Sequence, residues 1–240
     1  MNVLGVHMKI RNFAIVDYWT EQVNKMIDIL NIEYFPHDIA HQKAKEYFLN
    51  HKEYTHLLIL PDDVIATPSH VHILFQDAHQ LGHDKVICGY CNVDFSSDEV
   101  AISTAKMNKI PIPGRYDYRF IRLMDILAGK YEYPFIKVFF QGNTLTLIPR
   151  SVVEKLSFKG YIEKIDALFG KTMKREVMQD LQMAFELDKL GIDVVCDLRI
   201  LVMHFGNTIN LINVKGKTPR MYLKTKDGEI KDMVEMEPYK

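Results

Sequence analysis

The sequence has the length and composition of one globular α/β domain or of two small ones. It contains 240 residues, of which 48% are hydrophobic, with 12 glycines and 9 prolines. This composition excludes disordered, collagen-like and low-complexity proteins. A chain of this size buries roughly 70–75% of its unfolded surface and needs no disulfide or structural metal for stability. Lys and Arg number 30 against 31 for Asp and Glu, so the chain lacks the positive charge expected of a nucleic-acid-binding protein.

The sequence shows no membrane-spanning segment and no secretion signal. Its longest apolar runs, such as residues 57–60 and 194–196, are far shorter than the roughly 20 residues that a transmembrane helix requires. Residues 1–11 are not followed by a small-residue cleavage site. The three cysteines, an odd number, fit a reducing compartment better than a disulfide framework. We therefore expect a cytoplasmic protein.

The first ninety residues alternate between strand and helix patterns. Short apolar runs predict strands at residues 3–10, 32–35, 56–60 and 85–91. Apolar residues at helical spacing predict helices between these strands, one of them capped by Asp38 and another by Thr67 with Pro68 at its first position. This alternation predicts an α/β fold, with a central, mostly parallel, Rossmann-like sheet flanked by helices.

The second half of the chain is less regular. Residues 92–135 hold prolines and tyrosines that indicate loops over a binding face. Further elements are expected as a strand at 137–148, a helix at 176–190 and a strand at 193–204. We predict one domain over residues 1–206 and a small C-terminal extension, residues 207–240, packed on or near it. Residues 226–229 are expected to form a hairpin turn within this extension.

Acidic and imidazole side chains lie at the ends of predicted strands. Asp62 and Asp63 follow one buried strand, and His204 closes another. Ligands of open α/β sheets bind beyond the carboxyl ends of the strands. Carboxylate oxygens with an imidazole suit a divalent cation such as Mg²⁺ or Mn²⁺ that bridges a diphosphate. An aspartate at a strand exit also commonly caps its own loop, and both interpretations stay open at this stage.

Four segments carry a resemblance to a known family. They are LLILPDDVIATP (57–68), FQGNTLTLIPR (140–150), MQDLQMAF (178–185) followed by LGIDVV (190–195), and LVMHFG (201–206). In this order they are similar to the Asp-x-Asp strand, the glycine-bearing strand, the acidic helix and the closing histidine of GT-A glycosyltransferases, especially the family 2-like inverting enzymes. The resemblance covers roughly residues 1–206.

The resemblance implies transfer of a sugar from a nucleoside diphosphate sugar to a hydroxyl group of a saccharide, lipid or protein acceptor. It implies a divalent cation, Mn²⁺ or Mg²⁺, held by Asp63 and His204. Asp180 stands at the position of the general base, which favours inversion of the anomeric centre. The start of a helix lowers the pKa of a carboxylate, so Asp180 is expected to be a weak base unless it is partly desolvated.

The resemblance also implies a donor-binding set. It consists of His7, Arg11, Asp38, Asp62, Gly142 and Asn143. In this set Asp38 is equally well explained as a plain helix cap. Gly142 permits close approach to the sugar but is equally typical of a bend in a strand.

Two departures from the family pattern leave alternatives open. Pro61 occupies the first acidic position of the Asp-x-Asp motif, and Gln179 replaces the glutamate before the base. The first departure suggests a catalytically silent GT-A-like module that binds a nucleotide or saccharide. A retaining GT-A enzyme is a second alternative. A third is a nucleotidyltransferase, which also uses acids at strand ends to hold Mg²⁺.

Two further patterns are interpreted as structural. Cys88 and Cys91 have the spacing of a redox pair, but no amphipathic helix follows them, so buried strand cysteines are favoured. His79 and His83 are four residues apart, but Gly82 is expected to end the helix between them. No nearby residue in the sequence completes a zinc site, which favours a solvated helix end.

Overall fold

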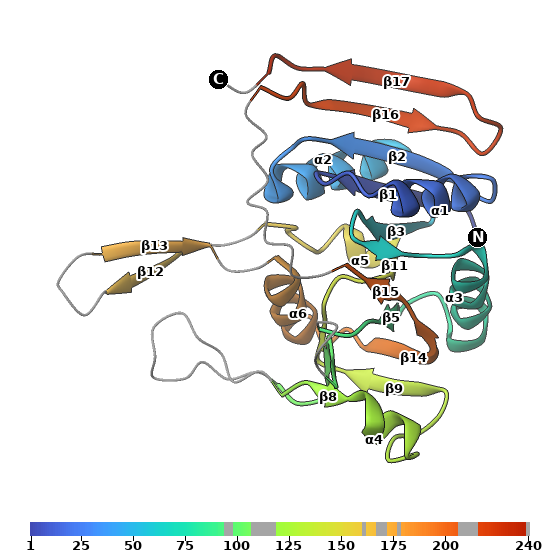
Figure 1. Cartoon of the computed structure of the whole chain (residues 1–240), viewed down its shortest axis with the longest axis vertical. Coiled ribbons are helices and arrows are strands. Elements are labelled where there is room, and N and C mark those ends of the chain that lie inside the picture. Colours follow the sequence, from blue (N-terminus) through green and yellow to red (C-terminus); the bar gives the residue numbers. More distant parts are fainter. Residues whose placement is uncertain are drawn as a thin grey trace.

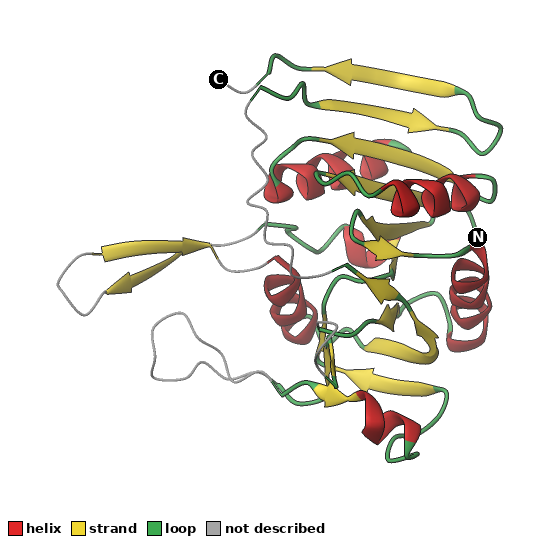
Figure 2. Ribbon diagram, viewed as in Figure 1, coloured by secondary structure: helices red, strands yellow, loops and turns green. Residues whose placement is uncertain are grey.

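The protein is built on a nine-stranded mixed sheet with helices on both faces, shown in a computed structural model (Figures 1 and 2). The structure describes residues 1–93, 98–106, 119–159, 162–166, 172–176, 179–205 and 216–238. For residues 37, 38, 162–166 and 172–176 it describes the backbone alone.

The strand order shows how the sheet is assembled. Across the sheet it is β17 (Ile230–Glu235), β16 (Arg220–Lys224), β2 (Asp28–Glu33), β1 (Val3–Lys9), β3 (His56–Pro61), β11 (Thr146–Pro149), β5 (Val86–Tyr90), β14 (Val194–Leu201) and β9 (Phe135–Val138). Three of the eight neighbouring pairs are parallel, namely β1 with β2, β1 with β3, and β5 with β14. The other five pairs are antiparallel.

The α/β class is confirmed, but the expectation of a mostly parallel sheet is wrong. Strand β11 enters between β3 and β5 and is antiparallel to both. All four residues of β11 are buried, as in a parallel strand covered on both faces. An apolar run carries no information about strand direction, so the sequence pattern did not reveal this reversal.

Two layers of helices cover the sheet. On one face lie α2 (His37–Asn50), α5 (Arg150–Val153) and α6 (Gln179–Lys189), and on the other lie α1 (Ala14–Asn24) and α3 (Pro68–Leu81). Alternate residues of β3 contribute to the two cores. Leu57 packs with the first layer and Leu58 with the second, because successive strand side chains point to opposite faces. The sheet is therefore buried on both sides where it lies between the helices.

The predicted start of α3 is confirmed in detail. The hydroxyl of Thr67 accepts a hydrogen bond from the backbone N–H of His70 at 3.3 Å, and the backbone N–H of Thr67 donates to Nδ1 of His70 at 3.3 Å. Pro68 occupies the first helical position, where its missing N–H costs no hydrogen bond. Gly82 follows the last residue of the helix with a φ of 90°, as predicted.

The C-terminal segment completes one side of the sheet. Strand β16 pairs with β2, and the predicted hairpin turn leads into β17. The backbone N–H of Thr225 donates to the carbonyl of Glu229 at 2.8 Å, and Gly228 has a φ of 87°. The described part of the predicted extension therefore contributes two strands to the main sheet. Residues 206–215 lie outside the described residues.

Short elements surround the main sheet. The paired strands are β4 (Val64–Ile65) with β15 (Met203–His204), β6 (Glu99–Val100) with β8 (Ile121–Arg122), β7 (Ile102–Ser103) with β10 (Phe140–Gln141), and β12 (Ile162–Asp166) with β13 (Thr172–Glu176). The irregular middle also contains α4 (Leu123–Leu127). The proline-rich segment 110–114 and Val177–Met178 lie outside the described residues.

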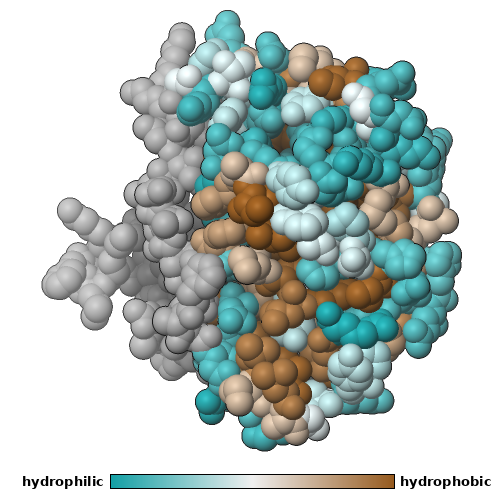
Figure 3. Space-filling model, turned by 45° about the vertical axis from the view of Figure 1, so that its right-hand side comes forward, coloured by the Kyte–Doolittle hydropathy of each residue, from teal (hydrophilic) through white to brown (hydrophobic). Residues whose placement is uncertain are grey.

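The surface mixes hydrophilic and apolar residues. On the face in Figure 3, apolar residues gather in the middle and lower part, and hydrophilic residues cover much of the upper and right-hand rim. Among the described residues, no helix has the length and apolar character needed to cross a membrane. The cytoplasmic location stays a prediction.

Candidate functional site

Asp63 and His204 meet at the edge where the parallel strands end. Asp63 follows β3, and β15 pairs with β4 so that His204 is the register partner of Val64. Nε2 of His204 lies 3.2 Å from Oδ2 of Asp63. The backbone N–H of Phe205 also donates to the carbonyl of Asp63 at 2.8 Å. The strand pairing thus holds two side chains together that the sequence placed at separate strand ends.

Arg11 connects this pair to the end of β1. Its Nη2 lies 2.6 Å from Oδ1 of Asp62 and 2.6 Å from Oδ2 of Asp63. Its Nε donates to the same Asp62 oxygen at 3.0 Å. Because β1 and β3 are parallel neighbours, their carboxyl ends bring the arginine to the two acids. The sequence suggested Arg11 as a donor contact but did not reveal its pairing with both acids.

Asp62 has a structural role in this arrangement. Its Oδ2 accepts hydrogen bonds from the backbone N–H groups of Ile10, at 2.8 Å, and of Arg11. With the two bonds from the Arg11 side chain, the carboxylate accepts four hydrogen bonds. The residue is 2% exposed. Asp62 therefore fixes the loop after β1 and has little room for direct contact with a donor.

The electrostatics of the cluster keep Asp63 ionised and Arg11 charged. Burial acts to raise the pKa of Asp63, but the hydrogen bond from His204 and the charge of Arg11 outweigh it and lower that pKa. Burial acts to lower the pKa of Arg11, and the two carboxylates outweigh it and raise that pKa. Two carboxylates thus face one guanidinium.

The described geometry does not fit a resident divalent cation at Asp63 and His204. Oδ2 of Asp63 is already 2.6 Å from Nη2 of Arg11, so a cation on that oxygen would lie beside a positive charge that repels it. A histidine that binds a metal usually donates its other ring N–H to an acceptor. Nδ1 of His204 is buried and has no hydrogen-bond partner among the described residues.

No three or more His, Cys, Asp or Glu side chains within the described ranges are arranged to hold a metal ion. The predicted Mn²⁺ or Mg²⁺ stays an untested prediction.

The other donor-binding residues are placed as follows. His7 is buried in β1, and burial lowers its pKa although the nearby Asp62 and Asp17 act to raise it. Its Nε2 has no hydrogen-bond partner in the described part of the chain. Because His7 is buried, its ring presents no open surface to a nucleobase. Asp38 lies in α2, and its side chain is not among those described.

Gly142 and Asn143 form a turn between β10 and β11. The backbone N–H of Gly142 donates to the carbonyl of Ala101 at 2.9 Å, and a Cβ at Gly142 would lie 3.0 Å from Cβ of Ala101. Asn143 has a φ of 46°, and its Oδ1 accepts a hydrogen bond from Nε2 of Gln141 at 2.9 Å. These contacts explain why a glycine is found here, because the backbone at position 142 passes close to Ala101. They leave its predicted contact with a sugar untested.

Asp180 is the second residue of α6, and its carboxyl group is desolvated. Burial raises its pKa to about 6, against the opposing effect of backbone hydrogen bonds such as the 2.7 Å bond from the N–H of Leu181. Desolvation therefore raises the pKa of Asp180 by more than its position at the start of a helix is expected to lower it. No hydrogen bond or ion pair between described residues connects Asp180 to Asp63 or His204.

The cysteines and the histidine pair near the end of α3 lie as follows. The three cysteines are free and buried, and burial raises the pKa of Cys91 to about 12, which disfavours the reactive thiolate of a redox pair. In the register of β14 and β5, Cys88 lies opposite Cys196. His79 lies in the last turn of α3 and His83 lies beyond its end at Leu81, with their ring centroids 5.1 Å apart.

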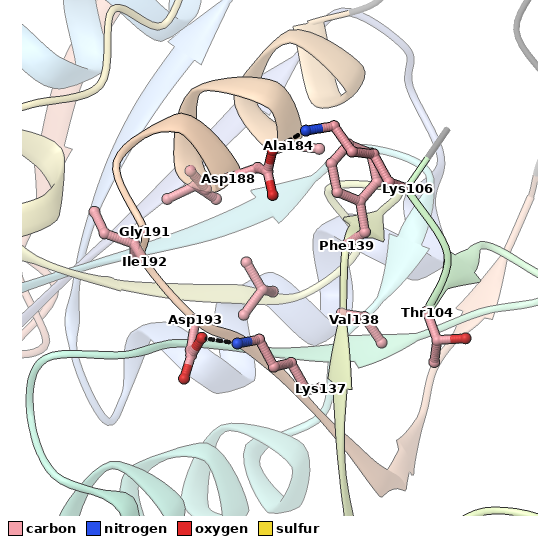
Figure 4. Close-up of a pocket in the computed structure, with 12 residues that line it drawn as sticks. Thr104, Lys106, Lys137, Val138, Phe139, Ala184, Asp188, Gly191, Ile192 and Asp193 are labelled. Carbon is pink, nitrogen blue, oxygen red and sulfur yellow. Dashed lines mark hydrogen bonds and ion pairs between the residues drawn. The ribbon is translucent and has the colours of Figure 1, made fainter. Parts of the chain in front are cut away.

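A separate pocket lies between β9 and the end of α6 (Figure 4). Apolar side chains including Val138 and Ala184 line it, and two ion pairs, Lys106 with Asp188 and Lys137 with Asp193, lie at it. None of the predicted site residues lines this pocket. It adjoins the start of β14, and the acid cluster lies beyond the end of that strand.

Comparison with known proteins identifies the fold and no more. No protein-family model matches the chain, and no curated protein matches its sequence. The chain is similar to the crystal structure of A197 from STIV, with a TM-score of 0.54 and 15% sequence identity. The match covers 96% of this chain and 93% of A197. At this identity the likeness concerns the arrangement of the α/β elements alone.

Proposed function

We propose that this chain is a GT-A-like glycosyltransferase that moves a sugar from a nucleoside diphosphate sugar to an acceptor hydroxyl group. The observation that carries the proposal is the cluster of Arg11, Asp63 and His204 beyond the carboxyl ends of β1, β3 and β14. Ligands of open α/β sheets bind at this edge. The order of the four sequence segments supports the same assignment, with the acceptor a saccharide, lipid or protein.

Asp180 is the proposed general base. Its carboxylate would take the proton of the acceptor hydroxyl while that oxygen bonds to the anomeric carbon. The bond between this carbon and the diphosphate oxygen breaks on the opposite face, so the sugar inverts. With a pKa of about 6, Asp180 is mostly ionised at pH 7 and is a stronger base than an ordinary aspartate.

A donor screen tests the proposal. The full chain is incubated with sugars activated by UDP, GDP, CDP and dTDP, together with a mixture of simple saccharide acceptors. We expect release of a nucleoside diphosphate from one donor class, together with a product of inverted configuration.

Each alternative has its own signature in this screen. Retained configuration identifies a retaining enzyme. A parallel incubation with nucleoside triphosphates and sugar phosphates covers the nucleotidyltransferase, which would release pyrophosphate. Binding of a donor without release of a diphosphate, for every acceptor offered, indicates the silent binding module. Any of these three outcomes replaces the proposal.

A further inference from the structure

The guanidinium of Arg11 lies 2.6 Å from Oδ2 of Asp63, the oxygen that also faces His204 and at which the family resemblance places a cation. We infer that Arg11 replaces the divalent cation, so that this chain binds the diphosphate of its donor through a guanidinium and without metal. This inference rests on the proposed function and deepens it. Arg11 would contact the diphosphate, and donor binding would not require a metal, which the sequence did not predict.

The hydrogen bonds of Arg11 leave part of the guanidinium available. The side chain has five N–H donors. The one on Nε and the two on Nη2 are directed to Asp62 and Asp63. The two on Nη1 have no hydrogen-bond partner among the described residues, and the side chain is 23% exposed. Two free N–H groups on a planar cation match the oxygens of a phosphate group.

The two acids hold this guanidinium in a fixed orientation. Asp62 binds both the side chain of Arg11 and its backbone N–H, so the position of the cation is set before a ligand arrives. A preorganised donor loses little conformational freedom on binding. The same contacts disfavour a metal at the acids, because Oδ1 of Asp62 and Oδ2 of Asp63 already face the guanidinium of Arg11.

Calorimetric titration of the full chain tests the inference. UDP, GDP, CDP and dTDP are each titrated in the presence of EDTA and in the presence of Mn²⁺. We expect one nucleotide to bind with affinities that differ by less than about 3-fold between the two conditions. Arg11→Met should lower that affinity in EDTA by at least about 10-fold, and Arg11→Lys should lower it less, because it keeps the charge but not the planar fork.

Two controls keep the result interpretable. Arg122→Met is the matched control, because Arg122, the last residue of β8, is exposed and pairs with Asp98, outside the cluster. Loss of the Arg11 side chain leaves the buried Asp62 without its charged partner, which can impair folding. The double variant Arg11→Met with Asp62→Asn removes that charge, and circular dichroism confirms that each variant is folded before titration.

The outcomes separate this inference from the proposed function. Binding that appears only with Mn²⁺ overturns the inference and leaves the glycosyltransferase proposal standing. Binding in EDTA that is unchanged by Arg11→Met and by the folded double variant also overturns it. No binding of any nucleotide to the folded wild-type chain, with or without Mn²⁺, overturns the inference and counts against the proposed function.

Discussion

Nε2 of His204 lies 3.2 Å from Oδ2 of Asp63, although 141 residues separate them in the chain. The contact depends on the antiparallel pairing of β15 with β4, which returns the chain after β14 to the end of β3. Arg11 reaches the same carboxylate oxygen from β1. Three distant segments therefore converge on Asp63.

Asp180→Asn should separate chemistry from binding. An amide has nearly the same shape as the carboxylate but cannot take a proton, so turnover should fall by roughly 10²–10⁴-fold while nucleotide affinity is unchanged. Steady-state kinetics and calorimetry measure the two effects. Asp188→Asn on the same helix is the matched control and should retain activity. Loss of nucleotide affinity in Asp180→Asn would make this residue a donor ligand.

The activity should depend on pH through Asp180. Its pKa of about 6 means that the base is protonated below pH 6 and ionised above it. We expect kcat/KM to rise as the pH increases through about 6 and then to level off. The residual activity of Asp180→Asn should lack this rise. A profile of Asp180→Asn with the same acidic limb as wild type would assign the limb to another group.

Two buried acids, Asp77 in α3 and Asp197 in β14, should make the stability of the fold depend on pH. Nη2 of Arg199 lies 2.5 Å from Oδ1 of Asp77 and 2.6 Å from Oδ2 of Asp197. Burial, followed by the hydrogen bond and charge of Asp197, raises the pKa of Asp77 to about 7. The unfolded pKa is about 3.9, so the folded state binds this proton more tightly. Asp77 thus contributes stability that is fully present below about pH 4 and is lost as the pH rises through 7.

Asp77→Asn tests this pH dependence. The amide keeps the shape of the side chain but does not titrate, so the free energy of unfolding should fall less between pH 5 and pH 8 than in wild type. Urea denaturation at the two pH values measures the difference. Asp84→Asn, an exposed acid after α3, is the control and should follow wild type. An Asp77→Asn curve parallel to wild type would contradict the raised pKa.

Gly89 and Gly142 should tolerate a methyl group differently. A Cβ at Gly89 would lie 2.5 Å from Cγ2 and 2.8 Å from the carbonyl oxygen of Ile200, whereas a Cβ at Gly142 would lie 3.0 Å from Cβ of Ala101. We expect Gly89→Ala to destabilise the fold by about 1–3 kcal/mol and Gly142→Ala by less. Urea midpoints rank the two variants. A larger loss for Gly142→Ala would place the tighter packing at the turn after β10.

The parts of the fold that depend on local chemistry could be predicted from the sequence. The run 56–60 followed by two acids became β3 and its loop, and Thr67 with Pro68 began a helix where the cap pattern placed it. The turn at 226–229 also matched. In each case the residues that specify the structure are neighbours in the chain, so a short window contains the whole signal.

The parts that depend on distant segments could not be predicted. The antiparallel direction of β11 is decided by its neighbours β3 and β5. The expected strand 193–204 divides at Val202 into β14 and β15, and the backbone N–H of Val202 donates a hydrogen bond to the carbonyl of Tyr90. The pairing of Arg11 with both acids requires the adjacency of β1 and β3, and the raised pKa of Asp180 requires burial by the surrounding fold. None of these has a local sequence signal.

A crystal structure of the chain with its preferred nucleoside diphosphate, grown in EDTA, tests the central claim most directly. The account predicts the diphosphate at the carboxyl edge of the sheet, with phosphate oxygens accepting hydrogen bonds from Nη1 of Arg11 and no metal density beside Asp63. A nucleotide bound in the pocket of Lys106 and Lys137, or a diphosphate at the acid cluster without contact to Arg11, would contradict it.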